Sequence, residues 1–171
     1  MKALKIILYI VLALVLVVAA AIFMIPTEYN VERSTTVNAP KKLVMQQVGR
    51  FENFAKWNPW GKLDPNMTKT ITGTDGEVGA KYSWEGNDDV WKGSMEITFI
   101  TDSRVDEKLV FLTPYESEAS TYITLEEVDG GTKVTWGMQG SNPRPMNLMV
   151  PMMDGFIGKD YEAGLAELKK M

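Results

Sequence analysis

The sequence has 171 residues, with 18 Lys and Arg against 22 Asp and Glu, and it contains neither cysteine nor histidine. Without those two residue types the chain forms no disulfide, no Cys/His zinc site, no Cys nucleophile and no His-based catalytic triad. Its acidic balance and the lack of a Lys/Arg stripe argue against nucleic-acid binding, because such a surface repels phosphates.

The first segment is apolar and long enough to cross a bilayer. Ile6 to Ile25 is a run of twenty uncharged residues, and a helix of that length spans about 30 Å. Lys2 and Lys5 precede the run, which predicts a single-pass membrane protein with a cytoplasmic N-terminus and an extracytoplasmic C-terminal domain. Ala19-Ala20-Ala21 offers the alternative of a cleaved signal peptide.

The folded domain is predicted to follow the apolar segment almost at once. Pro26 ends the helix, and Tyr29 to Val37 alternates in the manner of a strand. We therefore divide the chain into an anchor or signal peptide over residues 1–26 and one ligand-binding domain over residues 27–171. The short linker holds that domain against the membrane surface.

Two short helices come next, one opened by Pro40 and one over Phe51 to Trp57, which Asn58-Pro59 ends. The apolar period then changes to two, which is typical of strands, and turn residues separate the runs. These strands are Met67–Thr72, Ala80–Trp84, Met95–Phe99, Lys108–Leu112, Ser120–Leu125 and Lys133–Met138. The connections are too short for helical crossovers, so the strands form an antiparallel meander.

The last segment, Pro145 to Met171, returns to helical spacing, with Pro151 either kinking the helix or marking its start. A curved sheet must cover its apolar concave face, and this helix is the available cover. The predicted fold class is therefore α+β, with a cavity between the sheet and the C-terminal helix.

Several motifs along residues 31–168 resemble one superfamily: Arg33–Pro40, Trp57–Trp60, Gly79–Gly86, Gly93–Ile97 and Gly131–Trp136. The chain resembles the helix-grip (SRPBCC) superfamily of START lipid-transfer domains, polyketide cyclases/dehydrases and birch-pollen-allergen proteins, and it is closest to the polyketide cyclase/dehydrase branch. The resemblance implies a curved sheet of about seven strands wrapped around a long C-terminal helix. It implies no catalytic residue, because none of that superfamily's catalytic residues has a recognisable match.

Aromatic and methionine side chains are the candidates for a ligand pocket. Alternation places Tyr82 with Trp84 on one strand face, and Met95 with Ile97 and Phe99 on another. The residues predicted to line the pocket are Trp57, Trp60, Tyr82, Trp84, Met95, Ile97, Phe99, Phe111, Tyr122, Trp136, Met138, Met149, Met153 and Phe156. The alternative for each of them is that it simply fills the core.

Polar candidates are fewer. Tyr82, Tyr122, Gln139 and Arg144 are the groups considered for holding a ligand's polar end. Alternation sends Glu85 and Glu96 to the convex face, and Asn87-Asp88-Asp89 is typical of a hairpin turn rather than a calcium loop. We therefore predict no catalytic residue, no metal and no cofactor.

Three functions remain open. The first is a membrane-anchored binding or transfer domain for a small hydrophobic or lipid-like molecule. The second is a cyclase- or dehydratase-type enzyme in which Tyr82 or Glu85 handles a proton. The third is a membrane-tethered protein-interaction module, for which a filled core and an exposed apolar patch are the expected signs.

Overall fold

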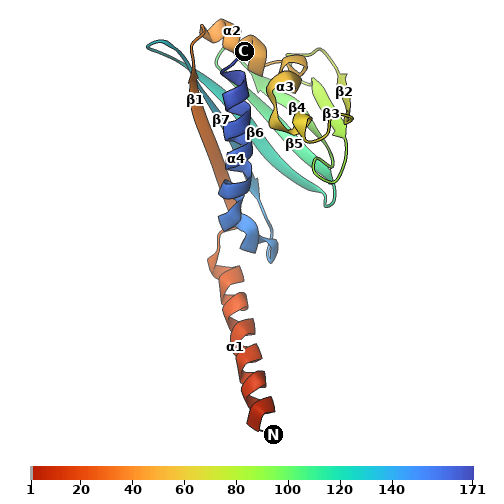
Figure 1. The fold of residues 1–171 in the computed structure, drawn as a ribbon, viewed down its shortest axis with the longest axis vertical. Coiled ribbons are helices and arrows are strands. Elements are labelled where there is room, and N and C mark those ends of the chain that lie inside the picture. Colours follow the sequence, from red (N-terminus) through yellow and green to blue (C-terminus); the bar gives the residue numbers. More distant parts are fainter. Residues whose placement is uncertain (1) are drawn as a thin grey trace.

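The computed structural model describes residues 2–171 (Figure 1). A helix of 23 residues, α1 (Lys2–Met24), extends away from the remaining elements, and its apolar window is not buried. The helix is long and apolar enough to cross a membrane by its length and composition. The predicted apolar helix is thus present as a separate, exposed element.

The remaining elements form one sheet with helices on one side of it. The sheet is antiparallel and seven-stranded, in the order β1-β7-β6-β5-β4-β3-β2. Its strands are β1 (Glu28–Val37), β2 (Thr68–Thr72), β3 (Lys81–Glu85), β4 (Lys92–Ile100), β5 (Arg104–Thr113), β6 (Ser117–Val128) and β7 (Gly131–Ser141). The helical segments are α2 (Lys41–Val48), α3 (Phe51–Trp57), η1 (Pro59–Lys62), η2 (Met146–Met149) and α4 (Val150–Leu168).

These elements confirm the predicted α+β order of one strand, two short helices, six antiparallel strands and a long final helix. Several strands are longer than the sequence indicates, and β5 begins at Arg104 rather than at Lys108. The final helix begins at Val150, so Pro151 lies in its first turn, where a missing amide hydrogen costs nothing. Pro151 therefore marks the start of α4 and does not kink it.

A β-bulge in β4 corrects one prediction. Ile97 pairs with Glu107, but the next registered pair joins Phe99 to Asp106, so one extra residue lies between the two pairs. Because a bulge shifts the alternation by one, Phe99 joins the convex face with Asp106 and is 48% exposed. The prediction that Phe99 shares a face with Met95 and Ile97 is wrong for this reason.

Trp136 is the centre of the core. Its ring stacks on Tyr161 of α4 with centroids 3.8 Å apart, and the rings of Trp57 and Trp60 meet it edge-on at 5.2 and 5.8 Å. The Thr121 hydroxyl accepts a hydrogen bond from Trp136 Nε1 at 3.1 Å and lies 3.3 Å from the Tyr161 hydroxyl. This junction fixes α4 to β6 and β7.

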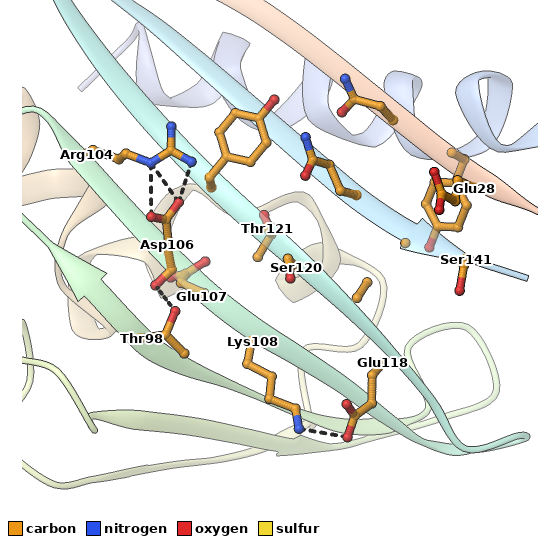
Figure 2. A pocket seen from close by; sticks show the side chains of 16 residues that line it. Glu28, Thr98, Arg104, Asp106, Glu107, Lys108, Glu118, Ser120, Thr121 and Ser141 are labelled. Atoms are coloured by element: carbon orange, nitrogen blue, oxygen red, sulfur yellow. Dashed lines mark hydrogen bonds and ion pairs between the residues drawn. The ribbon is translucent and has the colours of Figure 1, made fainter.

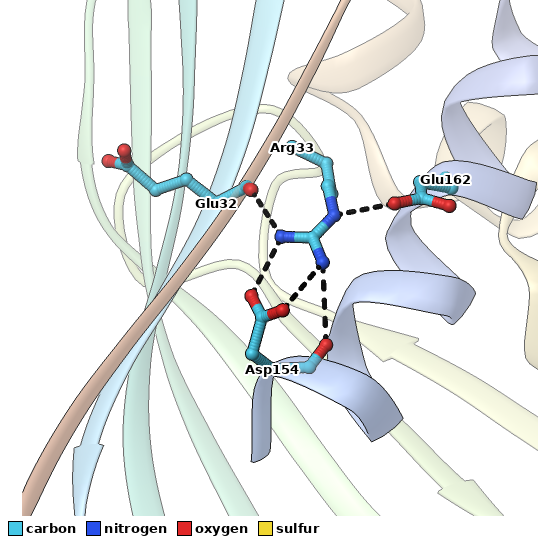
Figure 3. A network of polar contacts seen from close by, with 4 residues as sticks. All are labelled: Glu32, Arg33, Asp154 and Glu162. Carbon is cyan, nitrogen blue, oxygen red and sulfur yellow. Dashed lines mark hydrogen bonds and ion pairs between the residues drawn. The ribbon is translucent and has the colours of Figure 1, made fainter. Parts of the chain in front are cut away.

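A second junction fixes α4 to β1 (Figure 3). Arg33 donates from Nε to Glu162 at 2.6 Å and from Nη1 and Nη2 to Asp154 at 2.9 and 3.0 Å. The carboxylates raise the pKa of Arg33, while its guanidinium lowers the pKa of Asp154. A Cβ at position 158 would fall 2.0 Å from Arg33 Nη2, so glycine at this position lets the guanidinium lie across the helix.

We expect Thr121→Val to destabilise the chain by about 1–3 kcal/mol, because it leaves Trp136 Nε1 buried without an acceptor. Urea unfolding of the full chain in mild detergent, followed by tryptophan fluorescence, measures this loss. Thr124→Val is the matched control, since Thr124 lies on the opposite face of the same strand. Equal stabilities of the two variants would contradict the proposed role of the Thr121 hydroxyl.

Candidate functional site

The concave face of the sheet carries one acidic side chain in an apolar row. The register aligns Val31, Met138, Thr121, Glu107 and Ile97 across five neighbouring strands. All five are buried, and Glu107 is only 5% exposed. Burial, helped by the negative charge of Asp106, raises the pKa of Glu107 to about 8, and no hydrogen bond contributes to that shift. Glu107 is therefore mostly protonated and neutral near pH 7.

Another polar group on this face, the Tyr82 hydroxyl, lacks a hydrogen-bond partner within residues 2–171. This hydroxyl is buried, and burial raises its pKa to about 12. The Tyr82 ring stacks between Phe51 and Trp84, at 5.7 and 6.0 Å. Since buried polar groups are normally hydrogen-bonded, the Tyr82 hydroxyl marks where this interior would accept a polar atom, and the neutral Glu107 carboxyl lies on the same face of the sheet.

The structure gathers nine of the predicted pocket residues into one cluster. Six of them are buried in it and three pack against its edge; together they are Trp57, Trp60, Tyr82, Trp84, Met95, Ile97, Phe111, Trp136 and Met138. Trp57 and Trp60 also donate to Gln47 O and Asp160 Oδ2, at 3.1 Å each, which holds both indoles in the fold.

The predicted residues of the last helix lie elsewhere. Met149 and Phe156 are 45% and 55% exposed, and Met153 is half-buried. They belong to the first half of α4 and to η2, outside the hydrophobic core cluster. The expected closure of Met149 and Phe156 against the sheet is therefore not what the structure shows.

Tyr122 and Gln139 lie on the convex face, which corrects their assignment to the pocket. Tyr122 shares a row with Glu32, to which its hydroxyl donates a hydrogen bond, and its ring centre lies 4.9 Å from the Arg104 guanidinium. Burial and the neighbouring Glu32 raise the pKa of Tyr122 to about 12. Alternation with Ile123 and Leu125, both buried in the core, requires this outward position.

Two hollows are prominent on the surface of residues 2–171, and neither of these two lies between the sheet and α4. The larger, of about 1000 Å³, is an open groove along the convex face (Figure 2). Its charges largely pair within the groove, as Arg104 does with Asp106 at 2.7 Å and Lys108 with Glu118 at 2.8 Å. The smaller, of about 310 Å³, lies beside α2 and is lined in part by Met45, Arg50 and Ile100. The concave interior is instead filled by aromatic side chains, which is one of the two signs expected for a protein-interaction module.

The remaining polar candidates do not reach the interior. Glu85 forms an ion pair with Lys92 at 2.8 Å, and Asn87 caps its own hairpin turn by accepting from the Asp89 amide at 2.9 Å. Arg144 binds backbone carbonyls at the end of α1. Within residues 2–171, no group of three or more acidic side chains could hold a metal ion.

Glu107 was not predicted as a site residue because the predicted strand began at Lys108, four residues after the start of β5 at Arg104. Extending the alternation back from Leu109 by two positions would have placed Glu107 on the apolar face. An acidic residue in phase with apolar neighbours was the available signal.

The fold is a helix-grip: an antiparallel sheet of seven strands packed on a long C-terminal helix. Residues 28–171 match the model of the family described as "Polyketide cyclase / dehydrase and lipid transport". The chain belongs to that family. No curated protein matches the chain.

Solved structures share the fold at low identity. Protein CV1439 from Chromobacterium violaceum is 16% identical over 82% of this chain and 94% of its own, with a TM-score of 0.60. A protein from Thermobifida fusca is 19% identical over 82% and 90%, with a TM-score of 0.62. Ara h 8.0201 is 17% identical over 84% and 96%, with a TM-score of 0.57. At these identities the likeness shows the fold alone.

We expect Glu107→Gln to remove a pH dependence of stability. The folded chain holds the Glu107 proton up to about pH 8, whereas the unfolded chain loses it near the ordinary pKa of 4.5. Stability therefore falls as pH rises between those values, by about 1.4 kcal/mol per unit at most. The variant should gain stability relative to the parent as pH rises through this window.

Urea unfolding of the full chain in detergent, at several pH values from about 5 to about 9, measures this difference. Glu96→Gln is the control, because Glu96 lies on the opposite face of the sheet and the variant keeps Glu107. Parallel stability profiles for the parent and Glu107→Gln would contradict the buried, neutral state of Glu107.

Proposed function

We propose that this chain is a membrane-anchored domain that binds or transfers a small hydrophobic or lipid-like molecule on the concave face beneath α4. The observation that carries the proposal is a buried apolar surface with two polar groups: the Glu107 carboxyl, which burial keeps neutral, and the Tyr82 hydroxyl, which has no hydrogen-bond partner within residues 2–171. The lipid-transport description of the family supports it.

The two polar groups suggest what the ligand contains. A neutral carboxyl group donates one hydrogen bond and accepts others, so Glu107 suits an uncharged oxygen such as a carbonyl or hydroxyl. A ligand oxygen beside it would offset the cost of burying the carboxyl group. The favoured ligand is therefore an apolar body with one oxygen-bearing end.

Binding requires side chains to move, because the interior is filled. Met95 and Met138 lie on this face, and methionine is the apolar side chain that adapts most readily to a new shape. Burying about 300 Å² of ligand surface contributes about 7 kcal/mol, from which association costs of at least about 4 kcal/mol are subtracted. We expect modest affinity that depends on the polar end of the ligand.

The test is native mass spectrometry of the full chain released from mild detergent. We expect a bound mass of a few hundred daltons that Leu109→Trp removes, because Leu109 is buried on the concave face between Met95 and Ala119. Val110→Trp, on the opposite face of the same strand, should keep the ligand.

Urea unfolding shows whether each variant is folded, and the milder Leu109→Phe replaces Leu109→Trp if the latter is not. A parent chain that carries no bound mass, and that binds none of the added fatty acids, phospholipids and isoprenoids, would overturn the binding proposal.

The membrane part of the proposal rests on α1. Its apolar window is wholly exposed in the structure, and a bilayer would remove that surface from water. Lys2 and Lys5 favour a cytoplasmic N-terminus, which supports the proposed position of the domain outside the cytoplasm. A short linker then keeps the domain at the membrane surface.

A reporter that is active only in the cytoplasm, fused after Met171, tests this topology in cells. We expect no reporter activity, and activity when the fusion is made to a chain with Lys2 and Lys5 replaced and new lysines placed after Pro26. Activity of the unaltered fusion would contradict the proposed orientation.

A second candidate, a cyclase- or dehydratase-type enzyme, is favoured by Glu107 alone. A buried carboxyl group whose pKa lies near neutral suits general acid–base chemistry. Glu85, considered earlier for this role, is paired with Lys92 at the surface. An enzyme would convert the molecule it binds, and Glu107→Gln would retain binding while losing conversion.

A further inference from the structure

An apolar stripe is exposed along η2 and the first half of α4. It consists of Met146, Met149, Met152 and Phe156, and each is between 45% and 55% exposed. Their spacing of three, three and four residues places the four side chains on one face of this helical segment. The face that α4 buries is a different one, which includes Tyr161 and Leu165. We name these four residues the methionine stripe.

The segment that carries the methionine stripe begins beside the C-terminal end of α1 (Figure 1). Asn147, which is fully buried, donates from Nδ2 to the carbonyl oxygens of Ile22 and Ile25, at 2.8 and 2.7 Å. Arg144 donates from Nε to the Ile22 carbonyl at 2.9 Å, and its guanidinium lies 5.8 Å from the centre of the Phe23 ring. The Ile22 carbonyl belongs to the last turn of α1, where carbonyl groups have no backbone partners within the helix, and Ile25 directly follows the helix.

The contacts join α1 and η2 into one unit. A bilayer that surrounds α1 must therefore have its surface close to η2, where the stripe starts. Exposed apolar side chains of this size, continuous with a membrane-spanning segment, are typical of a surface that contacts lipid.

We propose that the methionine stripe lies in the interfacial region of the leaflet from which the C-terminal end of α1 emerges. The inference rests on the proposed membrane insertion of α1. The partner is a zwitterionic lipid surface, because residues 27–171 carry a net charge of −6, which disfavours anionic headgroups. Contact with lipid here would bring the first half of α4 to the bilayer and shorten the path of a lipid-like ligand to the concave face.

The chain has no cysteine, so single labelling sites can be introduced cleanly. We would attach an environment-sensitive fluorophore to Met152→Cys in the full chain, reconstituted in phosphatidylcholine vesicles that contain nitroxide-labelled lipids. Leu43→Cys on α2 is the matched control, since Leu43 and Met152 are 52% and 53% exposed. Leu12→Cys, in the middle of α1, reports whether the helix is inserted.

We expect nitroxide lipids to quench the labels at positions 12 and 152 several-fold more than the label at position 43. Shallow nitroxides should act most strongly at position 152 and deep ones at position 12. Quenching at position 12 with none at position 152 would overturn the inference and leave the anchor intact. No quenching at position 12 would overturn the anchor and the inference together.

A second copy of the chain is the competing occupant of the stripe. Dilution with unlabelled chain distinguishes it, because contact with lipid predicts unchanged quenching at position 152. A label at position 152 that is shielded without nitroxide lipids, and changes on dilution, would assign the stripe to a dimer and overturn the inference. Met149→Cys repeats the test if Met152→Cys does not fold.

Discussion

The stack of Tyr161 on Trp136 is the contact on which the rest of the domain depends. Two large rings, nearly parallel and 3.8 Å apart, fix the distance between α4 and the sheet. The Thr121 hydroxyl accepts a hydrogen bond from the Trp136 indole and lies within hydrogen-bond distance of the Tyr161 hydroxyl, so β6, β7 and α4 meet at one point. Trp57 and Trp60 pack around the same indole, and the α3–η1 segment is therefore positioned by this contact as well.

The same stack creates the chemical character of the interior. By holding α4 over the sheet, it keeps water from the row that contains Glu107, whose pKa rises through burial. A carboxyl group in this position opposes folding whenever it ionises, so the chain would be more stable with an apolar residue there. A buried carboxyl group that lowers stability when it ionises is typical of a binding or catalytic site, and Glu107 therefore connects the core to the proposed function.

Most of the fold could be predicted because it depends on the spacing of apolar residues and on the turn residues between the elements. Alternating apolar residues between glycine-rich turns predicted the strands, and the spacing of the final segment predicted the long helix. Part of the candidate site could not be found in this way. The bulge that turns Phe99 outward depends on how β4 pairs with β5, and no local pattern signals it. Glu107 and Tyr122 were within reach, because the alternation around Leu109 and Ile123 fixes their faces.

The hydrogen bonds between α1 and the η2 region could not be predicted from the sequence, since they bring Arg144 and Asn147 to residues more than a hundred positions earlier. They add a hydrogen-bonded attachment at the start of α4 to the two others, the aromatic stack on Tyr161 and the Arg33 junction at Asp154 and Glu162. The stretch between the start of α4 and the stack contains Pro151, Gly155 and the exposed methionines, and few of its side chains are buried. Polar contacts, rather than buried apolar surface, therefore attach the first half of α4 to the sheet and to the apolar helix.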